Sequence, residues 1–143
     1  MKFTTIVRFV LASGALLMAQ AASAQVAVIV NLKSPMASMT PEQVSAVFLG
    51  KSNTLPSGAT AVPADLPDSS GAREQFYSKA AGKTGAQVKA TWARLTFSGK
   101  ATPPKELGTA ADVKKFVANN VDAIGYIEKS AVDATVKVVL VVE

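Results

Sequence analysis

The sequence contains no cysteine and no histidine. Without cysteine the chain forms no disulfide bonds, so its folded state must rest on its own hydrophobic core. The same two absences remove the usual ligands of zinc, and they exclude the Ser-His-Asp and Cys-His arrangements of nucleophilic enzymes. We therefore expect no metal site and no cofactor, and we expect that the protein is not an enzyme.

Long apolar runs are also scarce, and the one at the amino terminus looks like an export signal. Lys2 and Arg8 accompany an apolar run over residues 9–18, and residues 22–24, Ala-Ser-Ala, form the small-residue pattern that signal peptidase recognises. The run is about half the roughly 20 residues that a membrane-spanning helix requires. These features predict a cleaved signal peptide over residues 1–24, no membrane anchor after cleavage, and a periplasmic location.

Charge is sparse, with 15 Lys and Arg against 10 Asp and Glu. A mild positive balance suits a small anionic ligand, but an ordinary soluble surface is the preferred explanation. Nucleic acid is not an expected partner, because the charge is small and basic residues are not interleaved with aromatic ones.

Residues 25–143 have the usual length of one domain and contain no internal repeat, low-complexity tract or linker. Apolar, β-branched runs predict strands at residues 26–30, 61–65, 123–127 and 136–142. Helix-start signals and apolar stripes predict helices at residues 41–49, 68–81, 84–97 and 109–119. Strands separated by helices indicate a single α/β domain with a parallel or mixed sheet and helices on both faces. The last strand is expected to be largely covered by helices.

The most informative stretch is residues 65–76, where a strand ends and a helix begins. Backbone N–H groups at a helix start are unpaired and carry a partial positive charge. Gly71 would let an anion approach the backbone, Ser70 adds a hydroxyl donor, and Arg73 supplies a charged fork. The candidate ligand-binding residues are therefore Ser69, Ser70, Gly71 and Arg73. The residues alone leave a purely structural interpretation open, because Asp and Ser are preferred helix N-caps.

Three motifs follow one another along the chain. Residues 39–51 end in Val-Phe-Leu-Gly-Lys, residues 68–72 are Asp-Ser-Ser-Gly-Ala with Phe76 beyond, and residues 122–127 are Asp-Ala-Ile-Gly-Tyr-Ile. In this order they resemble the second lobe of the phosphate-binding proteins of phosphate ABC transporters. Short, single-domain exported proteins described as phosphate-transporter substrate-binding proteins are similar over the full length. The resemblance implies a single periplasmic-binding-protein-like lobe.

Departures from this family are equally clear. Its full-length members have two lobes that close around phosphate, and this chain has length for one. Ser70 and Gly71 match the family motif, but the family's Arg falls at Leu66 and its Thr at Ala72, and Arg73 is only a local substitute. The resemblance implies a solute-binding domain for a small anion such as phosphate. The departures favour an alternative, a ligand-less interaction module that partners a transporter or a membrane sensor subunit.

Four further side chains have simpler interpretations. Trp92 lies on the apolar stripe of its helix, so a core position is expected in preference to ligand stacking. Tyr126 is likewise expected in the core. Asp65 and Asp68 could form a carboxylate pair, but the sequence supplies no partner group that would complete a reaction or a convincing metal site.

Overall fold

The computed structural model describes residues 25–143, so the predicted signal peptide over residues 1–24 lies outside the described residues. Within residues 25–143 the strands are β1 Val26–Val30, β2 Val62–Asp65, β3 Lys105–Glu106, β4 Ala123–Glu128 and β5 Lys137–Val142. The α-helices are α1 Pro41–Phe48, α2 Gly71–Phe76, α3 Gly85–Phe97 and α4 Ala110–Asn119. A π-helix, η1 Tyr77–Ala81, continues α2, and a short 3-10 helix, η2 Lys129–Ala131, follows β4.

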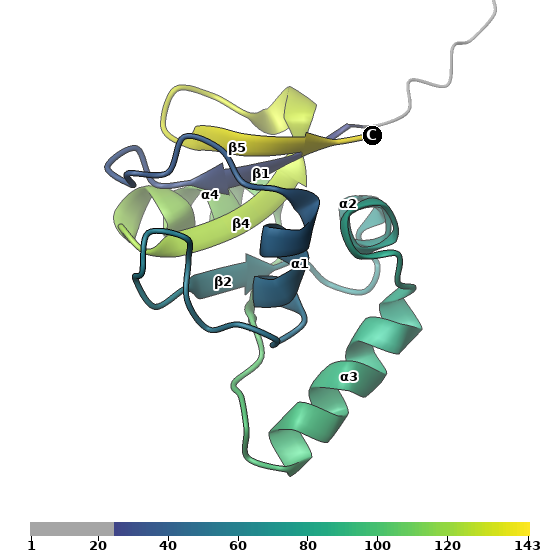
Figure 1. Ribbon diagram of the computed structural model, residues 1–143. Coiled ribbons are helices and arrows are strands. Elements are labelled where there is room, and N and C mark those ends of the chain that lie inside the picture. Colours follow the sequence, from purple (N-terminus) through teal and green to yellow (C-terminus); the bar gives the residue numbers. More distant parts are fainter. Residues whose placement is uncertain (1–24) are drawn as a thin grey trace, which may run out of the picture.

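The strands form one mixed sheet in the order β3-β2-β4-β1-β5 (Figure 1). The strand β1 is antiparallel to both β4 and β5, whereas β2 is parallel to β4 and β3. Every residue of β1 is buried, as expected for a central strand made only of Val, Ala and Ile. The predicted α/β fold with a mixed sheet is confirmed.

Helices cover both faces of the sheet; in Figure 1 α1 lies in front of it, α4 lies behind it, and α2 is seen end-on to its right. Successive residues of β4 point to opposite faces. Tyr126 packs against Phe48 of α1 and Phe76 of α2. A Cβ atom on Gly125 would lie 2.6 Å from Val113 Cγ1 of α4. Glycine at this position therefore allows α4 to pack closely against the sheet.

Two expectations about local structure are corrected. The strand β5 lies at the sheet edge and pairs with β1 alone among the described strands, and Val141 is 37% exposed. The expectation that helices largely cover this strand is therefore wrong. As an edge strand, β5 buries only some of its apolar side chains in the core. The helix expected over residues 68–81 starts later, at Gly71, because Ser70 is its N-cap.

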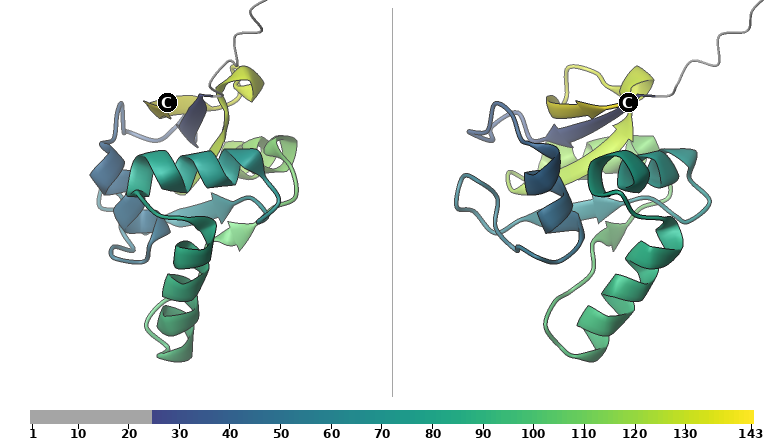
Figure 2. Two further views of the ribbon diagram at one scale, coloured as in Figure 1. Left: turned by 90° about the vertical axis from the view of Figure 1, so that its right-hand side faces the viewer. Right: turned by 45° about the vertical axis from the view of Figure 1, so that its right-hand side comes forward.

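The helix α3 extends away from the body of the domain in every view (Figures 1 and 2). It is anchored mainly by Val88 and Trp92, the two buried residues of the helix. The Trp92 Nε1–H donates a hydrogen bond of 2.8 Å to the carbonyl of Phe48, which confirms the expected core position. Phe97, at the far end of α3, is 97% exposed.

No helix in the described part of the chain is long and apolar enough to cross a membrane.

Candidate functional site

The candidate site lies where β2 ends and α2 begins. Ser70 is the N-cap of α2, and its Oγ accepts a hydrogen bond of 3.3 Å from the Arg73 N–H. Because the Oγ serves here as an acceptor, its own O–H remains a potential donor. No described residue accepts a hydrogen bond from the N–H groups of Gly71 and Ala72. The junction therefore combines a structural cap with unpaired donors, so the two sequence interpretations are compatible.

Arg73 points from this junction into the protein. Its Nη1 lies 2.9 Å from Asp65 Oδ2 and donates to the Leu66 carbonyl at 3.0 Å. Its Nε lies 3.4 Å from Asp68 Oδ1 without forming a hydrogen bond, and this buried Nε has no hydrogen-bond partner among the described residues. Arg73 as a whole is only 8% exposed. The guanidinium thus holds an internal ion pair and keeps one N–H unused.

Asp65 is the buried centre of this arrangement. Its carboxylate accepts hydrogen bonds from the hydroxyls of Tyr77, at 2.5 Å, and Tyr126, and from the Leu66 N–H at 2.9 Å. A buried charge is stable only when it is paired and its lone pairs are hydrogen-bonded, and Asp65 meets both conditions. We call Asp65, Arg73, Tyr77 and Tyr126 the buried polar cluster. The sequence indicated none of its contacts, since it joins β2, α2, η1 and β4 across as many as 61 positions.

Aromatic rings surround the buried polar cluster on the side of α1. The rings of Phe76 and Tyr126 are stacked, with centroids 4.0 Å apart and an interplanar angle of 8°, and Phe48 meets Phe76 edge-on at 4.9 Å. Such contacts stabilise a core beyond the area they bury. They also fix the two tyrosine hydroxyls in the direction of Asp65.

The buried polar cluster changes the acid–base behaviour of its members. Burial, followed by the negative charge of Asp65 and the hydrogen bond to it, raises the pKa of Tyr77 and of Tyr126 well above the ordinary value of 10.0. Burial is the largest single effect on Arg73 and lowers its pKa, but the charge of Asp65 together with those of Tyr77, Tyr126 and Asp68 outweighs it, and the net shift is upward. Arg73, Tyr77 and Tyr126 therefore keep their neutral-pH protonation states into the alkaline range.

The tyrosine shifts predict alkaline unfolding. Both phenols have folded-state pKa values above the unfolded value near 10, so their stabilising effect is complete below pH 10 and is lost as the pH rises beyond it. The free energy of unfolding should fall by about 1.4 kcal/mol per phenol for each pH unit above about 10. The chain has only two tyrosines. Absorbance at a phenolate wavelength should therefore rise only together with loss of the circular dichroism signal, and phenolate formation in the folded protein would contradict this prediction.

The outer side of the junction is a shallow cleft of about 280 Å³ between α2 and the start of α3. Arg73, Gly85 and Lys89 line it together with two acidic residues, Asp68 and Glu74. Lys89 Nζ lies 3.5 Å from Asp68 Oδ2. The two carboxylates considered from the sequence, Asp65 and Asp68, thus both lie against the Arg73 guanidinium, and Asp68 is also approached by Lys89.

The four predicted site residues are brought together only in part. Ser70, Gly71 and Arg73 share the first turn of α2, and Ser69 is exposed in the turn before it. The two positions that depart from the family motif are both buried, Leu66 at 4% and Ala72 at 7% exposure. Their side chains belong to the hydrophobic core.

Comparison with known proteins gives a clear result for the fold. Neither protein-family models nor curated protein sequences match this chain. Among solved structures, a protein from Clostridium perfringens assigned as a phosphate ABC transporter substrate-binding protein, with bound phosphate, matches 81% of this chain and 45% of its own with 24% identity and a TM-score of 0.66. An ABC-type phosphate transport receptor from Vibrio cholerae matches 81% of this chain and 46% of its own with 24% identity and a TM-score of 0.65.

A third solved structure agrees with the first two. The PstS protein of Borrelia burgdorferi is 14% identical, with a TM-score of 0.60, and the match covers 81% of this chain and 47% of that one. The chain thus spans less than half the length of the solved structures that it matches. The resemblance drawn from the three sequence motifs is therefore confirmed at the level of the fold, which is that of about half of a phosphate-transporter substrate-binding protein.

Proposed function

We propose that this protein is an exported solute-binding domain, without enzymatic activity, that binds a small anion at the start of α2. The ligand is phosphate or a phosphate-like group, held by Ser69, Ser70, Gly71 and Arg73. The protein acts in the periplasm and delivers or presents the anion to a membrane transporter. The similar structures support this proposal through their fold and through the phosphate bound in the Clostridium perfringens protein.

The observation that carries the proposal is the unused Nε–H of Arg73. An unpaired buried donor has a cost of about 1–3 kcal/mol, so a ligand oxygen that accepts from it would recover this energy. The unpaired N–H groups of Gly71 and Ala72 and the Ser70 hydroxyl belong to the same helix turn. A tetrahedral anion has enough oxygen atoms to accept from several of these donors at once.

Nearby carboxylates limit the affinity. Asp68 already approaches the Arg73 Nε, and Glu74 lines the same cleft. An incoming anion must therefore displace Asp68, whose side chain is 65% exposed and free to move into solvent. A single open lobe also leaves the ligand partly solvated, so we expect weaker binding than in proteins that enclose their ligand.

A thermal-shift titration tests the proposed anion site. Phosphate should raise the melting temperature more than sulfate or chloride at matched ionic strength, with about 2.7 kcal/mol of stabilisation at a hundredfold excess over the dissociation constant. Ser70→Asp should abolish the effect, because Asp preserves the N-cap but places a negative charge where the anion binds. Ser57→Asp, in an exposed loop, is the matched control. An unchanged phosphate response in Ser70→Asp, or no response in the wild-type protein, would contradict the assignment.

A second function is favoured by the exposure of Phe97. The helix α3 extends from the body of the domain (Figure 2). An aromatic side chain that is 97% exposed at the end of this helix suits contact with another protein. In this alternative the fold is retained as an interaction module for a transporter or sensor subunit. Pull-down from periplasmic extract should capture a partner that Phe97→Ser no longer captures. A monomer by light scattering with no captured partner would count against this function.

A further inference from the structure

A second cleft lies away from the start of α2, between the exit of α1, the segment before β2 and the far half of α3. Its volume is about 600 Å³, which falls in the range of roughly 300–1,000 Å³ typical of small-molecule sites. None of the residues that line it belongs to the anion site proposed above or to the cleft beside α2.

The charged residues that line this cleft are all positive. Lys51 and Lys100 line it, and its lining includes no Asp or Glu. Neither lysine forms an ion pair with any described carboxylate. The chain around Lys100 is also free of acidic residues, since positions 75–105 contain no Asp or Glu. This differs from the cleft beside α2, where two carboxylates oppose an anion.

Unused hydrogen-bonding groups accompany the two lysines. The side chains of Asn53, Thr60 and Thr102 line the cleft, and none of them forms a hydrogen bond with another described residue. Hydroxyl and amide groups of this kind donate to phosphate and carboxylate oxygens. The polar side of the cleft therefore matches an anionic group.

The opposite side of the cleft is apolar and fixed. Trp92 forms part of it, and its indole is held by the hydrogen bond from Nε1 to the Phe48 carbonyl. Gly50 lies directly beneath, with a φ of +74°, and a Cβ atom there would come within 3.0 Å of the indole and 2.6 Å of Leu95 Cδ1. Glycine at this position thus permits α3 to pack on the exit of α1, so the apolar wall exists before any ligand binds.

We propose that this cleft binds a small organic anion, with its phosphate or carboxylate group near Lys51 and Lys100 and its apolar body against Trp92. The proposal is independent of the anion site at α2, because the two sites share no residue. Inorganic phosphate alone would leave the apolar wall unfilled. We therefore expect the cleft to prefer an aromatic phosphate monoester over inorganic phosphate.

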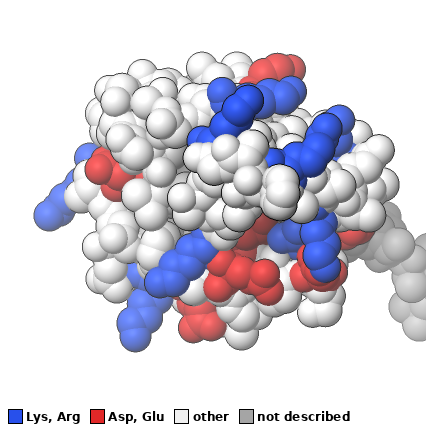
Figure 3. All heavy atoms as spheres, turned by 90° about the horizontal axis from the view of Figure 1, so that it is seen from below, with Lys and Arg blue, Asp and Glu red and all other residues white. Residues whose placement is uncertain are grey.

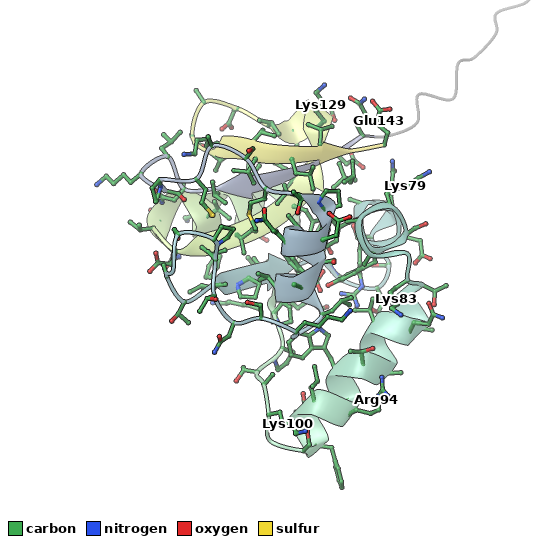
Figure 4. All side chains as sticks on the ribbon, in the orientation of Figure 1. Lys79, Lys83, Arg94, Lys100, Lys129 and Glu143 are labelled. Carbon is green, nitrogen blue, oxygen red and sulfur yellow. The ribbon has the colours of Figure 1, made fainter. Side chains whose placement is uncertain are left out.

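The protein supplies its own reporter for this cleft, since Trp92 is the only tryptophan of the chain. Titration of the purified protein with phenyl phosphate should change the tryptophan fluorescence in a saturable way. Lys51→Glu and Lys100→Glu should each weaken the apparent affinity by about tenfold or more. Lys79→Glu changes the net charge equally and lies at the opposite end of the α2–α3 region from Lys100 (Figure 4), so it should have less than about a twofold effect.

Four outcomes would overturn the proposal. The first is no fluorescence change up to about 10 mM phenyl phosphate. The second is a loss of affinity in Lys79→Glu as large as in Lys51→Glu and Lys100→Glu. The other two are binding of neutral benzyl alcohol, or of inorganic phosphate, as tight as that of phenyl phosphate. Ser70→Asp separates the two proposals, because it should remove the phosphate response of the α2 site and leave the phenyl phosphate titration unchanged. Matching melting temperatures of the lysine variants show that altered binding does not reflect unfolding.

Discussion

Replacing Asp65 with alanine should lower the free energy of unfolding by about 3–5 kcal/mol. The substitution removes the nearer and buried counter-ion of Arg73, a residue that is only 8% exposed, and it removes the acceptor of the Tyr77 and Tyr126 hydroxyls. A small domain has a total stability of about 5–15 kcal/mol, so the variant should lose a large part of it. Urea denaturation, followed by circular dichroism, measures the loss.

A matched control distinguishes this effect from simple removal of a negative charge. Asp122 is exposed and forms no ion pair with a described residue, so Asp122→Ala should change stability by less than about 0.5 kcal/mol. Asp65→Asn should fall between the two, because the amide keeps an acceptor for the tyrosines but loses the charge opposite Arg73. A loss below about 1 kcal/mol in Asp65→Ala would show that the buried polar cluster contributes little.

The second large effect concerns the attachment of α3. Trp92→Ala should lower the free energy of unfolding by about 3–5 kcal/mol, because it leaves a cavity beside Gly50 and an unpaired carbonyl at Phe48. This indole is one of only two buried side chains on α3. Thermal denaturation followed by helical circular dichroism is the suitable measurement, since the substitution also removes the only tryptophan.

Phe97 provides the control on the same helix. It is a similarly large aromatic residue but is 97% exposed, so Phe97→Ala should leave stability within about 0.5 kcal/mol of the wild type. If both variants were equally destabilised, α3 would have to be held by contacts other than those of Trp92. Equal and small effects would mean that the helix folds without its anchor.

The distribution of surface charge indicates where the two proposed sites obtain their preference for anions. Viewed from below, Lys and Arg side chains stand at several places around a broad uncharged area, and the acidic side chains are interspersed among them (Figure 3). No uniformly positive face is present in that view, so selectivity for an anion must come from local donors. At α2 these are the N–H groups of one helix turn and Arg73, whereas at the second cleft they are Lys51 and Lys100.

The sequence alone determined the elements and the class of the fold. Apolar β-branched runs predicted β1, β2, β4 and β5, and capping signals placed the starts of α1, α3 and α4 at Thr40, Thr84 and Thr109. Local steric and hydrogen-bonding preferences act within a few residues, so a linear pattern reveals them. At α2 the sequence offered several cap residues, and the structure shows that Ser70 is the one used.

Only the tertiary structure decided how the site residues are used. The sequence suggested Arg73 as a ligand-binding residue but not that its guanidinium pairs with Asp65, whose carboxylate also accepts from Tyr77 and Tyr126. Whether β5 was central or at an edge, and whether Lys51 and Lys100 share a cleft, depended equally on the packing of distant segments. Such contacts join residues far apart in the chain, and their energies depend on burial that no local pattern encodes.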